Sequence, residues 1–364
     1  AKVVLVIDEA QDMQADEFEL VELLMAENSE MRVIAVGDDD QNIYEFRGSD
    51  SKYLRMMTEK EEARQFELVE NFRSKPNLVE FTNLFARKIS HRLKSTEIIS
   101  RHKDNGFLRV FRHQSAHLEV PLVKQIINSE LKGSTCVMTK NNNEAFQITG
   151  MLKKAGMPVK LIQTNENFSL LKLRETRYVF ELLGKAESHQ VISEEKLKEV
   201  LHKLAERFGR TQTVKVVMSA INTFRKLYPK TKYRSDLEVF IGESKLEDFI
   251  EAAMETIMVS TMHKAKGREF DNVFIMLNNF IPDDDASKRV LYVAMTRAKE
   301  RLEIHYNGDY LENIYAEKLI KKEVNRTFAQ PAEFSVQLTH RDVQLGYFGF
   351  IQKRIYSLNS GDPL

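Results

Sequence analysis

Several residue types and patterns are scarce in this 364-residue sequence, and each absence excludes a class of protein. The only cysteine is Cys136, which excludes disulfide scaffolds and cysteine-based zinc sites and fits a reducing compartment. No apolar run approaches the roughly 18 residues that a membrane span needs, so we expect no membrane partner. The composition, 42% hydrophobic and 30% charged, is that of an ordinary globular protein. We therefore expect a cytoplasmic protein of two or three domains.

Two further absences concern chemistry and charge. Tryptophan is missing, and the 14 glycines never form the Gly-x-x-x-x-Gly-Lys-Ser/Thr pattern of a phosphate-binding loop. The net charge is zero, but residues 1–70 hold 19 acidic and 7 basic side chains, a net of −12, which residues 71–364 balance with +12. The acidic part is therefore not expected to bind polyanions by charge alone, whereas the remainder could. Solvated helix faces are the alternative explanation of the basic residues.

The first third of the chain shows the pattern of parallel α/β structure. Residues 3–7 and 31–36 are short apolar runs that predict buried parallel strands, and apolar residues recur at helical spacing between them. Each predicted strand ends in a polar loop, residues 8–12 and residues 37–41. Because ligands bind at the carboxyl ends of strands in open parallel sheets, both acidic loops lie at the expected ligand edge.

The rest of the chain continues the alternation and then departs from it. A helix is expected after Ser74, which can cap it, with Pro76 in its first turn. Residues 164–254 look helical, with a stripe that Ser193 and Gly209 bound, and residues 325–364 suggest a small β element. Further strands are predicted at residues 66–70, 107–111, 135–138, 158–162, 257–261, 273–277 and 302–306.

Some residues at the ligand edge suggest chemistry on their own. A strand-end carboxylate such as Asp8 can hold Mg²⁺, and the adjacent Glu9 can activate a water as a general base. Acidic residues are also common in the first turn of a helix, which is the alternative. Tyr44 and Phe46 beside Arg47 could form a platform on which bases stack, or they could fill a domain interface.

Five segments in order make the resemblance specific. The sequence resembles superfamily 1 DNA helicases of the UvrD/Rep/PcrA type in segments that are similar to helicase motifs II to VI. They are residues 6–12 (VIDEAQD), 37–48 (GDDDQNIYEFRG), 68–74 (LVENFRS), 259–270 (VSTMHKAKGREF) and 291–298 (LYVAMTRA).

The resemblance implies an α/β fold of RecA-like parallel-sheet domains and an ATP-dependent 3′–5′ DNA helicase or translocase with a role in DNA repair. Residues 1–105 would be the carboxyl-terminal part of the first RecA-like domain, and residues 106–163 with 255–324 would be the second. Residues 164–254 would form a reduced helical accessory insertion, followed by the tail at 325–364. The implied cofactors are ATP and Mg²⁺, and the implied partner is single-stranded DNA or a junction of single- and double-stranded DNA.

The resemblance also assigns roles to individual residues. The catalytic set would be Asp8, which also binds the metal, with Glu9, Gln41, Arg73 and Arg297. The nucleotide would be bound by Phe72, Gly267 and Glu269. The DNA would be bound by Tyr44, Phe46, Arg47, Thr261 and His263. The two arginines suit such a role because a planar guanidinium stabilises charge on a transferring phosphoryl group.

Three departures from the family pattern shape the expectation. Motif I, the phosphate-binding loop, should precede motif II, so we expect part of a longer helicase with little or no ATPase of its own. Phe72 and Phe46 stand where the family usually has tyrosine and tryptophan, which leaves a smaller stacking area at Phe46. The alternatives are a noncatalytic nucleic-acid-binding module, the helicase part of an AddAB/RecB-type helicase–nuclease, and a translocase that strips proteins from DNA.

Overall fold

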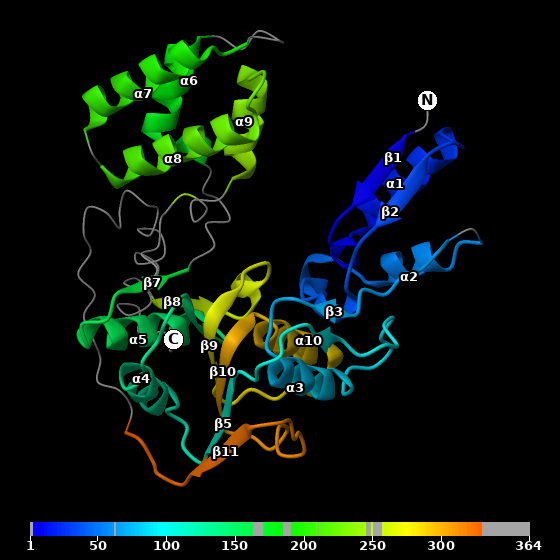
Figure 1. Ribbon diagram of the computed structural model, residues 1–364, viewed down its shortest axis with the longest axis vertical. Helices are drawn as coiled ribbons and strands as arrows, with labels where there is room; N and C mark the ends of the chain where they lie inside the picture. The colour runs from blue at the N-terminus through cyan, green and yellow to red at the C-terminus, as the bar shows by residue number, and fades with distance from the viewer. Residues whose placement is uncertain are drawn as a thin grey trace, which may run out of the picture. The chain divides into compact units, whose positions relative to one another are not determined.

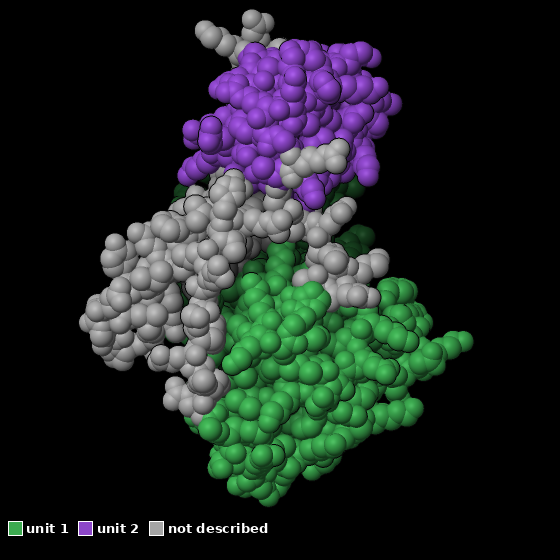
Figure 2. Space-filling model, turned by 90° about the vertical axis from the view of Figure 1, so that its left-hand side faces the viewer, with its two compact units in different colours: residues 1–163, 254–334 green, residues 164–253, 335–364 purple. Residues whose placement is uncertain are grey.

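The computed structural model describes residues 3–61, 63–162, 170–184, 191–209, 211–244, 249 and 257–329. The chain divides into two compact units, shown in green and purple in Figure 2. Unit 1 comprises residues 1–163 and 254–334, and unit 2 comprises residues 164–253 and 335–364. Among the described residues, no helix is long and apolar enough to cross a membrane.

A seven-stranded parallel sheet forms the centre of unit 1, in the order β11-β5-β10-β9-β6-β8-β7. The predicted α/β parallel fold is thereby confirmed. The strands are β5 (Phe107–His113), β6 (Thr135–Thr139), β7 (Val159–Leu161), β8 (Ile257–Thr261), β9 (Phe270–Leu277), β10 (Ala298–Tyr306) and β11 (Leu319–Val324).

Helices cover both faces of this sheet (Figure 1). One face packs against α3 (Pro76–Ala86) and α10 (Asp285–Met295), and the other packs against α4 (Glu119–Ile127) and α5 (Asn142–Lys154). Side chains of a strand point alternately to the two faces. In β9, Val273 and Ile275 accordingly join the α3/α10 core, whereas Phe274 and Met276 join the α4/α5 core.

The amino-terminal segment forms a second, smaller sheet. Strands β1 (Val4–Ile7) and β2 (Arg32–Ala35) pair in parallel and are joined by α1 (Ala15–Glu27). The strands were expected to be buried, and this expectation is wrong: Val4 is 55%, Val6 63% and Ile34 52% exposed. In the described part of the chain this sheet has only two strands, and only its alternate positions, such as Ile7, pack inward. Its other face is therefore open.

The segment around residue 70 differs from the prediction in three respects. Only β3 (Glu70–Asn71) of the expected strand pairs, with β4 (Ile99–Ser100), and Phe66 and Leu68 are 83% and 84% exposed. Ser74 does not cap α3, because its hydroxyl donates to the Ala298 carbonyl at 2.6 Å and Lys75 takes the N-cap position. A short α2 (Lys52–Thr58) precedes this segment.

Two features at the end of unit 1 lie outside the sequence prediction. Strand β11 pairs with β5, and its sequence LIKKEV is mostly exposed and charged, so it shows no apolar run that would identify a strand. The β element expected at 325–364 falls almost entirely on residues outside the described part of the chain.

Unit 2 is helical over its described residues, as the apolar stripe predicted. Its helices are α6 (Arg174–Leu183), α7 (Glu194–Phe208), α8 (Gln212–Leu227) and α9 (Arg234–Glu243). Leu197, Val200 and Leu204 of the predicted stripe are fully buried in its core. Ser193 caps α7 by accepting a hydrogen bond from the Lys196 amide at 3.1 Å, and Gly209 ends it with a left-handed φ of 67°.

A buried pair of imidazoles joins two strands of the large sheet. His113 Nε2 of β5 lies 3.0 Å from His305 Nδ1 of β10, and the two rings stack. His113 Nδ1 and His305 Nε2 have no hydrogen-bond partner among the described residues. Burial lowers the pKa of His113 to about 4 and holds the pKa of His305 well below its usual value. Both rings are therefore neutral in the folded protein at neutral pH.

We predict that this pair makes the fold sensitive to acid. As the pH falls from 6.5 towards 4, the unfolded chain binds protons at both histidines and the folded chain does not, so the free energy of unfolding decreases. Each histidine contributes roughly 3 kcal/mol to this loss at most. Urea unfolding of His113→Leu/His305→Leu should show a shallower decrease over this range, with exposed His202→Leu as the control. Equal slopes in the parent and the double variant would contradict this account.

Candidate functional site

The motif II loop follows β1 and is tied to the motif III loop by one glutamine. Gln11 Nε2 donates to Glu9 Oε2 at 2.6 Å, and Gln11 Oε1 accepts from the Asp38 amide at 2.9 Å. Glu9 itself has a left-handed φ of 52°. A Cβ at Gly37 would lie 2.7 Å from Gln11 Oε1, so only glycine fits beside this side chain. The sequence analysis assigned no role to Gln11, whose function depends on contacts that spacing does not reveal.

The side chain of Gln41 connects motif III to motif VI. Its Nε2 donates to Asp38 Oδ2 at 2.9 Å, and its Oε1 accepts from Arg297 Nη2 at 3.0 Å. Arg297 is 3% exposed and also donates to the Val293 carbonyl. Burial, with the nearby charge of Arg73, lowers the pKa of Arg297 to about 10, so it keeps its charge at neutral pH. Two residues predicted as catalytic are thus in direct contact.

Lys266 of motif V lies between the motif II and motif III loops. Its ammonium forms an ion pair with Asp12, donates to the Gln41 carbonyl at 2.9 Å and lies 3.5 Å from Glu9 Oε2. Its side chain is 7% exposed. From the sequence, Lys266 was only additional positive charge or a solvated lysine, and the structure places it inside the site. Burial raises the pKa of Asp12 although the contact with Lys266 opposes this.

A second group contains the residues predicted to bind the nucleotide. Arg73 Nη2 lies 2.6 Å from Glu269 Oε1, and Lys299 Nζ lies 3.2 Å from Glu269 Oε2. The hydrogen bond from Arg73 lowers the pKa of Glu269. The ring of Phe72 is 72% exposed and therefore accessible to a planar ligand. Gly267 has φ 76°, which side-chain-bearing residues rarely adopt.

Four of the five residues predicted to bind DNA lie together. The ring of Phe46 lies 6.2 Å from Tyr44 and 5.8 Å from His263, and the guanidinium of Arg47 lies within 5.5 Å of both aromatic rings. Phe46 is 70% exposed, so this cluster presents an accessible aromatic surface. Burial and the charge of Arg47 lower the pKa of His263. Thr261, at the end of β8, is only 6% exposed.

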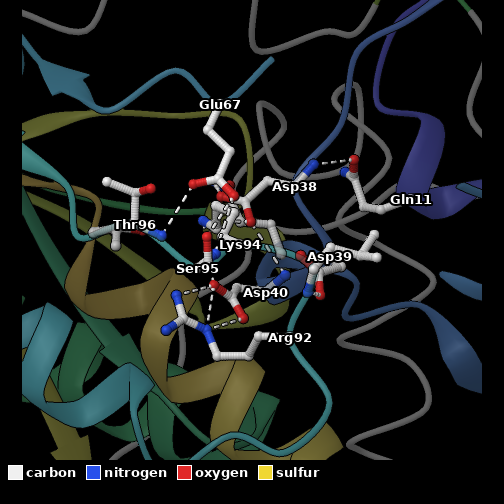
Figure 3. Close-up of polar contacts among 12 residues, drawn as sticks. Gln11, Asp38, Asp39, Asp40, Glu67, Arg92, Lys94, Ser95 and Thr96 are labelled. Atoms are coloured by element: carbon white, nitrogen blue, oxygen red, sulfur yellow. Dashed lines mark hydrogen bonds and ion pairs between the residues drawn. The ribbon is translucent and has the colours of Figure 1, made fainter. Parts of the chain in front are cut away.

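The three consecutive aspartates of motif III are neutralised by another segment of the chain (Figure 3). Carboxylate oxygens of Asp38, Asp39 and Asp40 lie within 4.8 Å of one another. Arg92 donates to Asp40 at 2.9 and 2.6 Å through two nitrogens. Lys94 Nζ lies 2.7 Å from Asp38, and the Leu93 amide donates to Asp39 at 2.7 Å. Cations and amides of this chain therefore already bind these carboxylates. No motif pointed to Arg92 or Lys94.

The residues fit Mg²⁺ at Asp8. This exposed carboxylate lies at the end of β1, and Oδ1 accepts from the Glu9 amide at 2.9 Å. Mg²⁺ typically binds one or two protein carboxylates and completes its shell with phosphate oxygens and water. A single strand-end aspartate beside a nucleotide site is such a ligand.

This geometry, with strand-end carboxylates, a bridging glutamine and buried arginines on RecA-like parallel sheets, is that of a helicase motor. The chain belongs to the UvrD-like helicase family. The UvrD-like helicase C-terminal domain matches residues 66–185 and 186–309, and the UvrD/REP helicase N-terminal domain matches residues 2–62.

Curated relatives agree with this assignment. The chain is 24% identical over 344 residues to the Gabija protein GajB of Bacillus cereus, covering 86% of this chain and 66% of GajB. It is 21% identical over 406 residues to the ATP-dependent DNA helicase Rep of Buchnera aphidicola, covering 83% and 62%. It is 24% identical over 382 residues to the RecBCD enzyme subunit RecB of Chlamydia pneumoniae, covering 81% and 35%. The chain thus spans at most about two thirds of these relatives.

Proposed function

We propose that this chain carries the motor of an ATP-dependent DNA helicase or translocase that moves 3′ to 5′ on single-stranded DNA. The observation that carries the proposal is the contact of Gln41 with Arg297, beside Glu9 and Lys266. These side chains come from four segments of the sequence that resemble different helicase motifs. A fold that needed them only for stability would have no reason to gather this combination of charges.

Each residue of the site has a chemical role in this proposal. Asp8 holds Mg²⁺, which neutralises phosphate charge, and Glu9 accepts a proton from the attacking water. Arg73 and Arg297 stabilise charge on the transferring phosphoryl group. The exposed ring of Phe72 stacks on adenine, and Gly267 and Glu269 meet the ribose and phosphate region. Lys266 adds a positive charge next to Glu9.

The DNA site is proposed to lie at the aromatic cluster. Tyr44 and Phe46 stack on bases, with Arg47 over both rings, while Thr261 and His263 contact the strand. His263 contacts DNA as a neutral hydrogen-bonding group, because its pKa is lowered. Gln41 lies three residues before Tyr44, so a change at the phosphate is transmitted to the base-stacking residues through a short segment.

The first test is ATP hydrolysis with and without oligo-dT. Because the sequence contains no phosphate-binding loop, we expect little or no turnover from these 364 residues alone. In a polypeptide that also supplies the loop, we expect DNA-stimulated turnover. Glu9→Gln should lower kcat by roughly 10²- to 10⁴-fold, while the exposed Glu19→Gln should not. Tight DNA binding without any turnover would favour the noncatalytic module instead.

The second test concerns base stacking. Tyr44→Ala and Phe46→Ala should each weaken binding of a fluorescent single-stranded oligonucleotide, because stacking contributes about 1–3 kcal/mol per base. That range corresponds to a roughly 5- to 150-fold higher Kd by fluorescence anisotropy. Phe66→Ala is the matched control, since this ring is 83% exposed and the cluster does not include it. Equal affinities of all three variants and the parent would exclude the cluster as the DNA site.

A further inference from the structure

Lys94 lies outside every segment that resembles a helicase motif, yet it contacts the site. Its Nζ is 2.7 Å from Asp38 Oδ1 and 3.2 Å from Asp40 Oδ2, and its side chain is 17% exposed. The ring centre of Tyr292, in the motif VI helix α10, is 5.9 Å away. Figure 3 shows Lys94 beside Asp38 and Asp40, on the segment that also carries Arg92.

The contact made by Lys94 continues to the catalytic glutamine through Asp38. One oxygen of Asp38 accepts from Lys94, and the other accepts from Gln41 Nε2 at 2.9 Å. An ionised carboxylate can only accept hydrogen bonds, and a guanidinium can only donate them. The Gln41 amide therefore has one favourable orientation here, with Nε2 towards Asp38 and Oε1 towards Arg297.

The charge of Lys94 is what keeps Asp38 in this position. The carboxylates of Asp38 and Asp40 repel each other, since their oxygens lie within 4.8 Å. Arg92 is bound to Asp40, so Lys94 is the cation that contacts both carboxylates. Without it, Asp38 would gain by turning towards water, and Gln41 would lose the acceptor that fixes its amide.

We propose that Lys94 is a positioning residue that orients the Gln41 side chain towards Arg297 through Asp38. This inference rests on the proposed function in one respect, namely that the oriented Gln41 acts at the phosphate. The orientation itself is a property of the chain and can be measured without nucleotide.

The experiment measures the side-chain amide of Gln41 by NMR in the whole 364-residue protein labelled with ¹⁵N-glutamine, with Gln41→Glu identifying the signal. In Lys94→Met we expect the Gln41 amide signal to move towards the position of a free glutamine. Lys94→Arg keeps the charge and should restore the parent position. Lys153→Met, an exposed lysine of α5, is the matched control and should leave the signal unchanged.

The kinetic readout is made in a polypeptide that hydrolyses ATP. Lys94→Met should lower kcat by roughly 10- to 100-fold with little change in KM, because misplacement of a catalytic group slows the chemical step. Lys94→Gln replaces Lys94→Met in both readouts if the latter does not fold. An unchanged Gln41 signal in the folded variant would overturn the inference. Absence of ATPase in the parent would contradict the proposed function, while the NMR result would still decide the inference.

Discussion

The side-chain amide of Gln41 is the contact on which the arrangement of this site depends. Its nitrogen donates to Asp38 and its oxygen accepts from Arg297, across a sequence separation of 256 residues. Gln11 then connects the amide of Asp38 to Glu9. A continuous chain of hydrogen bonds therefore runs from the proposed general base to the proposed arginine finger. Because every donor in it faces an acceptor, a shift at one end changes the position of the other.

The division of charge along the sequence has a structural explanation in this site. Residues 1–70 carry a net charge of −12, and later residues carry the balancing +12. Part of this balance is made within the chain: Lys94 pairs with Asp38, Lys266 with Asp12, and Arg289 with Glu45 at 2.5 Å. These cations hold the acidic loops in place, a use of basic residues that neither nucleic-acid binding nor solvated helix faces had suggested.

Strongly patterned elements were predictable from sequence, and elements defined by tertiary contacts were not. The apolar runs of β6, β8 and β9 and the stripe of α7 identify buried elements because local hydrophobicity and burial coincide there. Strand β11 is charged and lies at the sheet edge, so its only signal is pairing with β5. In the site, motif residues such as Gln41 were predictable by resemblance. Lys94 acts through Asp38, and no local pattern records that contact.

A double-mutant cycle between Gln41 and Arg297 tests the central claim most directly. The free energies of unfolding of Gln41→Ala, Arg297→Ala and the double variant would be measured in urea. If the two side chains form one unit, their effects are not additive, and a coupling energy of about 0.5–3 kcal/mol is expected for residues in contact. Additivity to within about 0.5 kcal/mol would show that the two residues act independently, and the connected site described above would be wrong.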